Sequence, residues 1–215
     1  MPKRALELWT KFKLFRISAS VDAIDSVNNY IRHPSNFSIV EKNLKLLDDT
    51  PDNIAVSVST TIQALNIFYF PDLLRWLLNS GFRKVNIRGP AVDPCFFVHA
   101  HVLHRPEYLS VKILPPELKI SIQEKFASFS IWLDSHLSDR SISPEQARRW
   151  KESILSSLNG YLRFMNERDE TQRLPLFWKE MRDSDQFRSE DIRLVLPEIA
   201  GPILGWLKNN HENYN

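Results

Sequence analysis

Two segments of the chain alternate between apolar and small polar residues, and this alternation restricts the possible folds more than any other feature. In residues 54–61, Ile54, Val56 and Val58 share one face, while alanine, serine and threonine occupy the other. Residues 14–22 alternate in the same way, with arginine, serine and aspartate on the polar face. Because successive side chains of a β-strand point to opposite faces, both segments are predicted to be strands with one apolar and one polar face.

The residues between and around these strands have helical spacing. The order helix, strand, helix, strand, helix, strand in the first half predicts βα units and a parallel sheet. The predicted elements there are a helix ending within 3–13, strands over 14–22 and 54–61, helices over 36–48 and 70–79, and strand-like segments at 85–88 and 96–103.

The polar strand faces refine the predicted fold class. A strand of an ordinary parallel sheet is apolar on both faces, because helices cover both. In a barrel or half-barrel, the apolar faces meet the outer helices and the polar faces line an interior with room for a polar ligand. The sequence therefore predicts an α/β fold built on a partial (β/α) barrel of about three parallel strands. The pattern leaves open the alternative of a one-sided sheet whose polar face meets water.

The second half is predicted to be helical. Ser143-Pro144-Glu145-Gln146 has the residues of a helix start, with serine as N-cap and proline at the first helical position. The predicted domains are a half-barrel over residues 1–130 and a helical C-terminal extension over 131–215. The predicted helices of this half cover 115–129, 143–166, 176–183 and 195–208.

Composition excludes several classes of function. The chain has 215 residues, of which 43% are hydrophobic, so it is not a disordered chain. Its net charge of +2 gives no support for nucleic-acid binding. A single cysteine excludes an internal disulfide and an all-cysteine metal site. The sequence contains no apolar run of the roughly 20 residues that a membrane span needs, so we expect a cytoplasmic protein without membrane or nucleic-acid partners.

Polar residues gather where the predicted strands end, which is where ligands bind in parallel-sheet proteins. A zinc site of Cys95, His99 and His101 is conceivable, although no distant fourth ligand is evident. The alternatives without a ligand are a turn capped by Asp22, a polar loop after the second strand, and buried histidines. The candidate binding residues are Ser18, Ser20, Asp22, Asp25 and Arg32 after the first strand, Thr60, Thr61, Gln63 and Asn66 after the second, and His101 on the third.

Several of these runs resemble the radical S-adenosylmethionine (SAM) enzymes, and in particular a twitch-domain subgroup found in bacteria and phages. Residues 17–23 (ISASVDA) with Tyr30-Ile31-Arg32, Phe37 and Asn43 resemble the family's fourth strand and the helix after it. Residues 58–66 (VSTTIQALN) resemble its fifth strand. Later segments resemble its sixth strand, exit helix and C-terminal segment, namely 102–106, Leu109-Ser110, 114–119 and 181–198 with Asp185-x-x-Arg188.

The resemblance implies a binding role for five residues. Ser20 and Asp22 would approach the amino-acid or ribose groups of SAM, and Arg32 would pair with its carboxylate. Asn66 would bind near the adenine or ribose, and His101 would lie on the sixth strand.

The family's defining C-x-x-x-C-x-x-C loop and its first three strands are missing from this sequence. In the full-length family that loop holds a [4Fe-4S] cluster, which cleaves SAM reductively. This chain alone cannot bind that cluster. The resemblance therefore implies the C-terminal half of such a protein, from a truncated frame or a split or decayed gene, which supplies only the far wall of the SAM site.

Three functional hypotheses remain from the sequence. The first is a truncated or split radical SAM protein whose N-terminal half-barrel comes from a separate polypeptide. The second is a non-enzymatic α/β subunit that binds a partner. The third is an unrelated α/β enzyme in which Asp22 and His101 act as an acid–base pair. A half-barrel would leave the edge of its first strand unpaired, so we expect the chain to be marginally stable or sticky by itself.

Overall fold

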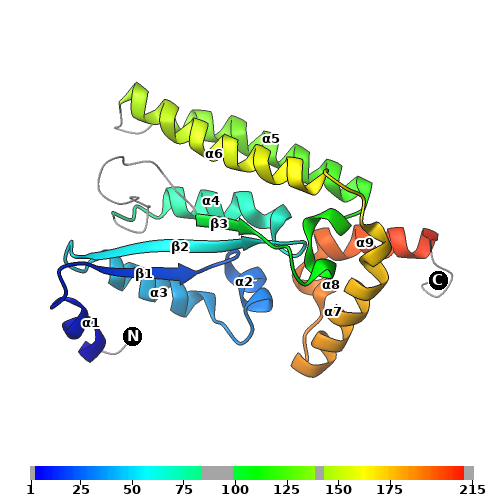
Figure 1. Ribbon diagram of the computed structural model, residues 1–215, viewed down its shortest axis with the longest axis horizontal. Coiled ribbons are helices and arrows are strands. Elements are labelled where there is room, and N and C mark those ends of the chain that lie inside the picture. Colours follow the sequence, from blue (N-terminus) through cyan, green and yellow to red (C-terminus); the bar gives the residue numbers. More distant parts are fainter. Residues whose placement is uncertain (1–2, 84–98, 139–142, 211–215) are drawn as a thin grey trace.

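The computed structural model describes residues 3–83, 99–138 and 143–210, and it contains a three-stranded parallel sheet (Figure 1). The strands are β1 (Phe15–Ser20), β2 (Ile54–Ile62) and β3 (His99–Val102), and they lie side by side in chain order. Ser20 is in register with Ser59, and Thr61 with His101. The prediction of a mixed α/β fold with parallel strands is confirmed. The strand-like segment 85–88 lies outside the described residues.

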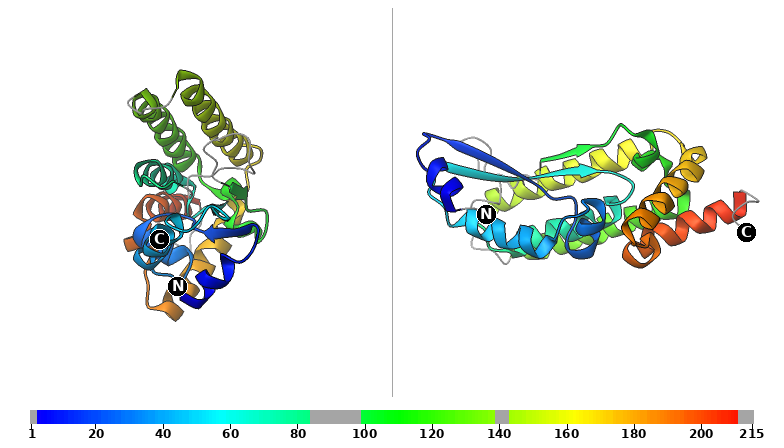
Figure 2. Two further views of the ribbon diagram at one scale, coloured as in Figure 1. Left: turned by 90° about the vertical axis from the view of Figure 1, so that its left-hand side faces the viewer. Right: turned by 90° about the horizontal axis from the view of Figure 1, so that it is seen from below.

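The apolar face of the sheet is covered by the helices that connect its strands (Figure 2). Every second residue of β2 from Ile54 to Ile62 is buried, and the apolar ones share one core with α3 (Phe37–Asp48) and α4 (Phe70–Asn79). The opposite face of β2 is only partly buried, and the corresponding residues of β1 are exposed. The sheet is therefore one-sided within the described part of the chain.

Two short helices frame β1. Helix α1 (Lys3–Trp9) precedes the strand, and the Trp9 ring stacks on Phe15 with 4.8 Å between ring centroids. Helix α2 (Asp25–Ile31) follows it and begins at Asp25, whose φ is 48°. Aspartate tolerates this left-handed conformation better than most residues. The sequence pattern did not predict α2, because it has only 7 residues and no side-chain cap.

The second half of the described chain is helical, as predicted. A long pair of helices, α5 (Pro116–Ser138) and α6 (Pro144–Met165), runs along the sheet, and Ser143 caps α6 by accepting a bond from the Gln146 amide. Helices α7 (Leu174–Arg188), α8 (Ile192–Val195) and α9 (Pro197–Asn210) pack beyond the carboxyl ends of the strands. The predicted domain boundary at residues 130/131 falls within α5, and the two-domain division stays a prediction.

Helix α6 also lies against one edge of the sheet. The Tyr161 hydroxyl of α6 donates to the Ala100 carbonyl of β3 at 3.4 Å, and the ring of Phe164 lies edge-on to His104 at 5.2 Å between centroids. Among the helices of the described ranges, none is long and apolar enough to cross a membrane.

Candidate functional site

The chain turns sharply where β1 ends, and hydrogen bonds to β2 and α2 hold this turn. The Val21 amide donates to the Ser59 carbonyl at 3.0 Å, and the Thr60 hydroxyl donates to the Val21 carbonyl at 2.6 Å. The side-chain oxygen of Asn28, on α2, accepts a bond from the Asp22 amide at 3.1 Å. These bonds fix the backbone of Asp22, so its carboxylate has one defined direction.

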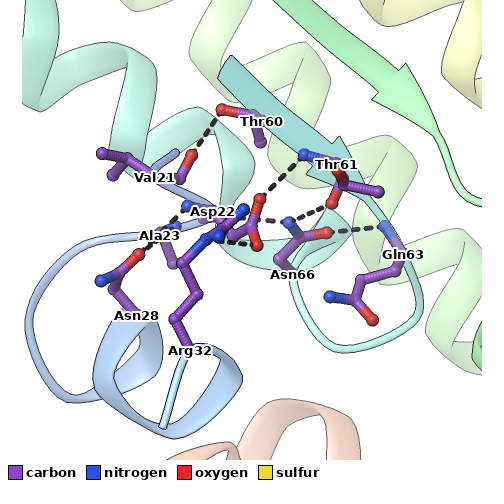
Figure 3. Close-up of polar contacts among 9 residues, drawn as sticks. All are labelled: Val21, Asp22, Ala23, Asn28, Arg32, Thr60, Thr61, Gln63 and Asn66. Atoms are coloured by element: carbon purple, nitrogen blue, oxygen red, sulfur yellow. Dashed lines mark hydrogen bonds and ion pairs between the residues drawn. The ribbon is translucent and has the colours of Figure 1, made fainter. Parts of the chain in front are cut away.

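The Asp22 carboxylate joins β2 to α2 (Figure 3). Its Oδ1 accepts a bond from the Thr61 amide at 2.8 Å, and its Oδ2 forms an ion pair with Nε of Arg32 at 2.8 Å. The Asp22 side chain is 5% exposed and that of Arg32 is 32% exposed. A buried carboxylate needs such partners, because an unpaired charge away from water is costly. Part of the Arg32 side chain remains at the surface.

Asn66 closes the same network from the loop after β2. It is fully buried, and its Nδ2 donates to the Asp22 carbonyl at 3.0 Å and to the Thr61 carbonyl at 2.8 Å. Its Oδ1 accepts a bond from the Gln63 amide at 2.8 Å. Both amide hydrogens are thus used inside the protein, so Asn66 holds the strand ends together in this structure.

Ser20 and His101 lie on the strands themselves. Ser20 is exposed and is the last residue of β1, and His101 is exposed on β3. The register places Ser20 opposite Ser59 and His101 opposite Thr61. Both residues therefore belong to the polar face of the sheet, with β2 between them. Of the five predicted site residues, the structure brings Asp22, Arg32 and Asn66 into direct contact.

An anchor on the C-terminal helices holds α2 in place, and sequence reasoning did not identify its geometry. The buried Tyr30 hydroxyl donates to Oδ1 of Asp185 at 2.8 Å, and Oδ2 of Asp185 accepts a bond from the Ile192 amide at 2.8 Å. Arg188 donates to the Tyr30 carbonyl at 3.2 Å. Burial, followed by the nearby Asp185 carboxylate, raises the pKa of Tyr30 above its ordinary value. Arg32 directly follows α2, so this anchor also positions Arg32.

Asn28 was missed, and Tyr30 was noticed only as part of a family-like run, because nothing in their spacing marks them. Both lie on a helix too short for its periodicity to be read, and their partners are far away in sequence or belong to the backbone. Asp185 and Arg188 were noticed only as part of a family-like segment. Their separation by three residues placed them on one helix face, but it did not indicate which element they contact.

The residues of this chain do not fit an iron–sulfur cluster. Over the described ranges, no group of three or more histidine, cysteine, aspartate or glutamate side chains could hold a metal ion. Cys95 of the conceivable zinc site lies outside the described residues. A ligand that carries a carboxylate, as SAM does, would meet the partly exposed Arg32 side chain and the Ser20 hydroxyl on the open face.

The fold and this site define a mixed α/β protein with a one-sided parallel sheet and a polar, hydrogen-bonded junction at the carboxyl ends of its strands. Comparison with protein-family models, with curated proteins and with solved structures gives no match.

Proposed function

We propose that this chain forms the C-terminal wall of an incomplete (β/α) barrel of the radical SAM type, and that Arg32 and Ser20 bind SAM there. The observation that carries the proposal is the way Arg32 is held. Its Nε is paired with a buried aspartate at the end of a parallel strand, and about a third of its side chain is exposed (32%).

This arrangement suits a carboxylate ligand. Nε faces Asp22, so the two terminal amino groups of the guanidinium are the ones available for a bidentate contact. Asp22 and Asn66 act as positioning residues in this proposal, since their polar groups bond within the chain. Ser20 and His101 extend the polar surface from β1 across to β3, where the sugar and base of SAM would lie.

Two further features support the proposal. The strands follow one another in chain order with their connecting helices on one face, as in a barrel wall. The family-like runs occur in the family's order along the sequence. In the complete family the cluster supplies the reductive cleavage of SAM. This chain provides none of the cluster ligands, so its own contribution is to bind and orient SAM, with the rest of the barrel supplied by a separate polypeptide.

Calorimetric titration of SAM into the purified chain tests this function. We expect binding that Arg32→Ala weakens at least about tenfold, the size of a lost charge-assisted contact. Arg32→Lys should also weaken binding, because lysine lacks the planar fork of arginine. Arg16→Ala is the matched control. Arg16 is an exposed arginine on β1. It shares a face of the sheet with Ser20 but lies at the other end of the strand.

A ligand series makes the test specific for the carboxylate. Decarboxylated SAM, which lacks that group, should bind more weakly than SAM and should be insensitive to Arg32→Ala. Failure to bind SAM would contradict the proposal, as would SAM binding that is unchanged in Arg32→Ala.

The second candidate function is a partner-binding subunit without a SAM site. The observation in its favour is that Asp22 and Asn66 use their polar groups to join the loop after β1 to β2, as a purely structural network would. This candidate predicts no SAM binding, so the same titration separates the two. The acid–base pair of Asp22 and His101 stays a prediction.

A further inference from the structure

The sheet ends on one side in an unprotected strand. Over the described ranges, β1 pairs with β2 on one edge and with no strand on the other. Exposed edge strands usually carry charges, a proline or a bulge that prevents pairing with another chain. The sequence of β1, Phe-Arg-Ile-Ser-Ala-Ser, contains one charged residue and no proline. The outer edge of β1 can therefore pair with a strand of another chain.

The helical layer ends on the same side with an apolar surface. Phe37 of α3 contacts Trp76 of α4, with 5.2 Å between ring centroids. Ile39 and Leu46 lie roughly half a turn around the helix from Phe37, so they point away from α4. They are 57% and 45% exposed.

Helix α1 and its connection to β1 add to this surface. Leu8, Phe12 and Leu14 are 48%, 56% and 51% exposed. We call these three residues, together with Ile39, Leu46 and the free edge of β1, the β1-side surface. Half of the large exposed hydrophobic residues in the described ranges belong to it. By contrast, α6 lies against β3 at the other side of the sheet.

The shape of the sheet indicates what kind of partner this surface fits. The sheet ends at β1 and the helical layer ends at α3 on the same side. An occupant must therefore offer a strand that pairs with β1 and an apolar helix face that packs on Ile39 and Leu46. A second copy could pair its β1 antiparallel to this one, but it would extend the sheet in its own plane and leave both polar faces open. Added β/α units would continue the one-sided winding and curl over the polar face of β1 and β2.

We propose that the β1-side surface docks a β/α unit of a second, different polypeptide, whose strand pairs with β1 and whose helix packs on Ile39 and Leu46. This inference rests on the proposed function, because it treats the polar face as the interior of a shared barrel. It goes further by assigning the contact to particular residues on α1, β1 and α3.

The test uses the full chain and, as the probe, the first three β/α units of a twitch-subgroup radical SAM enzyme, produced separately with its cluster loop. Sedimentation velocity of the mixture should show a 1:1 complex, and hydrogen exchange should show new protection of β1 amides. Ile39→Glu combined with Leu46→Glu should weaken the complex at least about tenfold, because it places two charges in an apolar contact.

The matched control is Ile120→Glu combined with Ile131→Glu on α5, at positions that are 55% and 75% exposed. Both double variants change exposed residues, and circular dichroism checks that both fold. Absence of a complex would overturn the inference, as would a complex that both variants weaken equally. A homodimer that is broken by Ile39→Glu with Leu46→Glu, but not by the control variant, would also overturn the inference. The partner would then be a second copy of this chain.

Titration of SAM separates the two proposals. A complex that forms on the β1-side surface but leaves SAM unbound would support the docking inference and contradict the proposed function. SAM binding to the chain through Arg32 without any complex would support the proposed function and contradict the docking inference.

Discussion

At the scale of single residues, one carboxylate joins three segments that are distant in sequence. Asp22 bonds to Thr61 after a separation of 39 residues and pairs with Arg32 at the end of α2, while Asn66 donates to its carbonyl. Thr61 and Asn66 belong to the end of the second strand, and Arg32 belongs to the helix after the first. The position of Arg32, the proposed partner of the SAM carboxylate, thus depends on this junction.

We expect Asp22→Asn to lower the free energy of unfolding by about 2 kcal/mol, as loss of a largely buried ion pair with a partly exposed partner would. Asparagine retains an oxygen for the Thr61 amide, so the cost comes mainly from the unpaired Arg32. Urea denaturation measures the change.

The matched control is Asp183→Asn. Asp183 pairs with Lys179 on the surface of α7, and this change should cost less than about 0.5 kcal/mol. Equal losses in the two variants would show that the Asp22 pair contributes no more than a surface pair.

At the scale of elements, the sequence predicted mainly the helices that are long enough for the helical spacing of their apolar residues to be read. Two of them, α3 and α6, also have a side-chain cap. Asn36 caps α3, since its side-chain oxygen accepts bonds from the Ser38 and Ile39 amides at 3.1 and 3.4 Å. The predicted helix over 36–48 agrees with the observed Phe37–Asp48, and 70–79 agrees with α4. α2 was missed because tertiary contacts hold it rather than its own sequence signals.

The cap of α3 gives a prediction at this scale. Asn36→Ala should lower the free energy of unfolding by about 1 kcal/mol, because two amides at the helix start lose their acceptor. Asn36→Asp should retain most of the stability, since aspartate caps equally well. Thermal unfolding followed by circular dichroism measures both. A stability of Asn36→Ala equal to that of the unchanged chain would contradict this assignment.

At the scale of the whole molecule, the C-terminal helices are held against the strand ends by buried tyrosines. Tyr30 donates to Asp185 of α7, and Tyr69 donates to Glu198 of α9 at 2.5 Å. Burial, and then the accepting carboxylates, raise the pKa of Tyr30 and of Tyr69 above their ordinary value. Burial alone raises the pKa of Tyr161 to about 12.

These shifts predict a loss of stability at alkaline pH. Below about pH 10 both the folded and the unfolded chain keep the phenol protons, so the full stability is present. Above that pH the unfolded chain releases them while the folded chain keeps them. The free energy of unfolding should then fall by about 1.4 kcal/mol per pH unit for each of the three tyrosines, up to about pH 12.

Urea unfolding at a series of pH values from about 8 to about 11 measures this slope. Tyr161→Phe should reduce the slope by about 1.4 kcal/mol per pH unit. It should change stability little near neutral pH, because the bond from Tyr161 to Ala100 is long, at 3.4 Å. An unchanged slope in this variant would contradict a role for Tyr161 in the alkaline loss.

The sequence by itself determined the strands, the longer helices and their order. The alternation in residues 14–22 and 54–61 predicted the strands and their two faces, because side-chain direction in a strand depends only on the local backbone. Residues at strand ends also marked Asp22, Arg32 and Asn66 as neighbours, because the ends of parallel strands meet at one edge of a sheet.

Only the tertiary structure decided how these side chains are used. Pairing of β1 with β2 brings the Thr61 amide to Asp22, and packing of α7 on α2 brings Asp185 to Tyr30. Which polar atoms remain for a ligand depends on such long-range contacts, since each bond made inside the protein removes a donor or an acceptor. The exposure of Ile39 and Leu46 likewise depends on where α4 packs, which no local pattern contains.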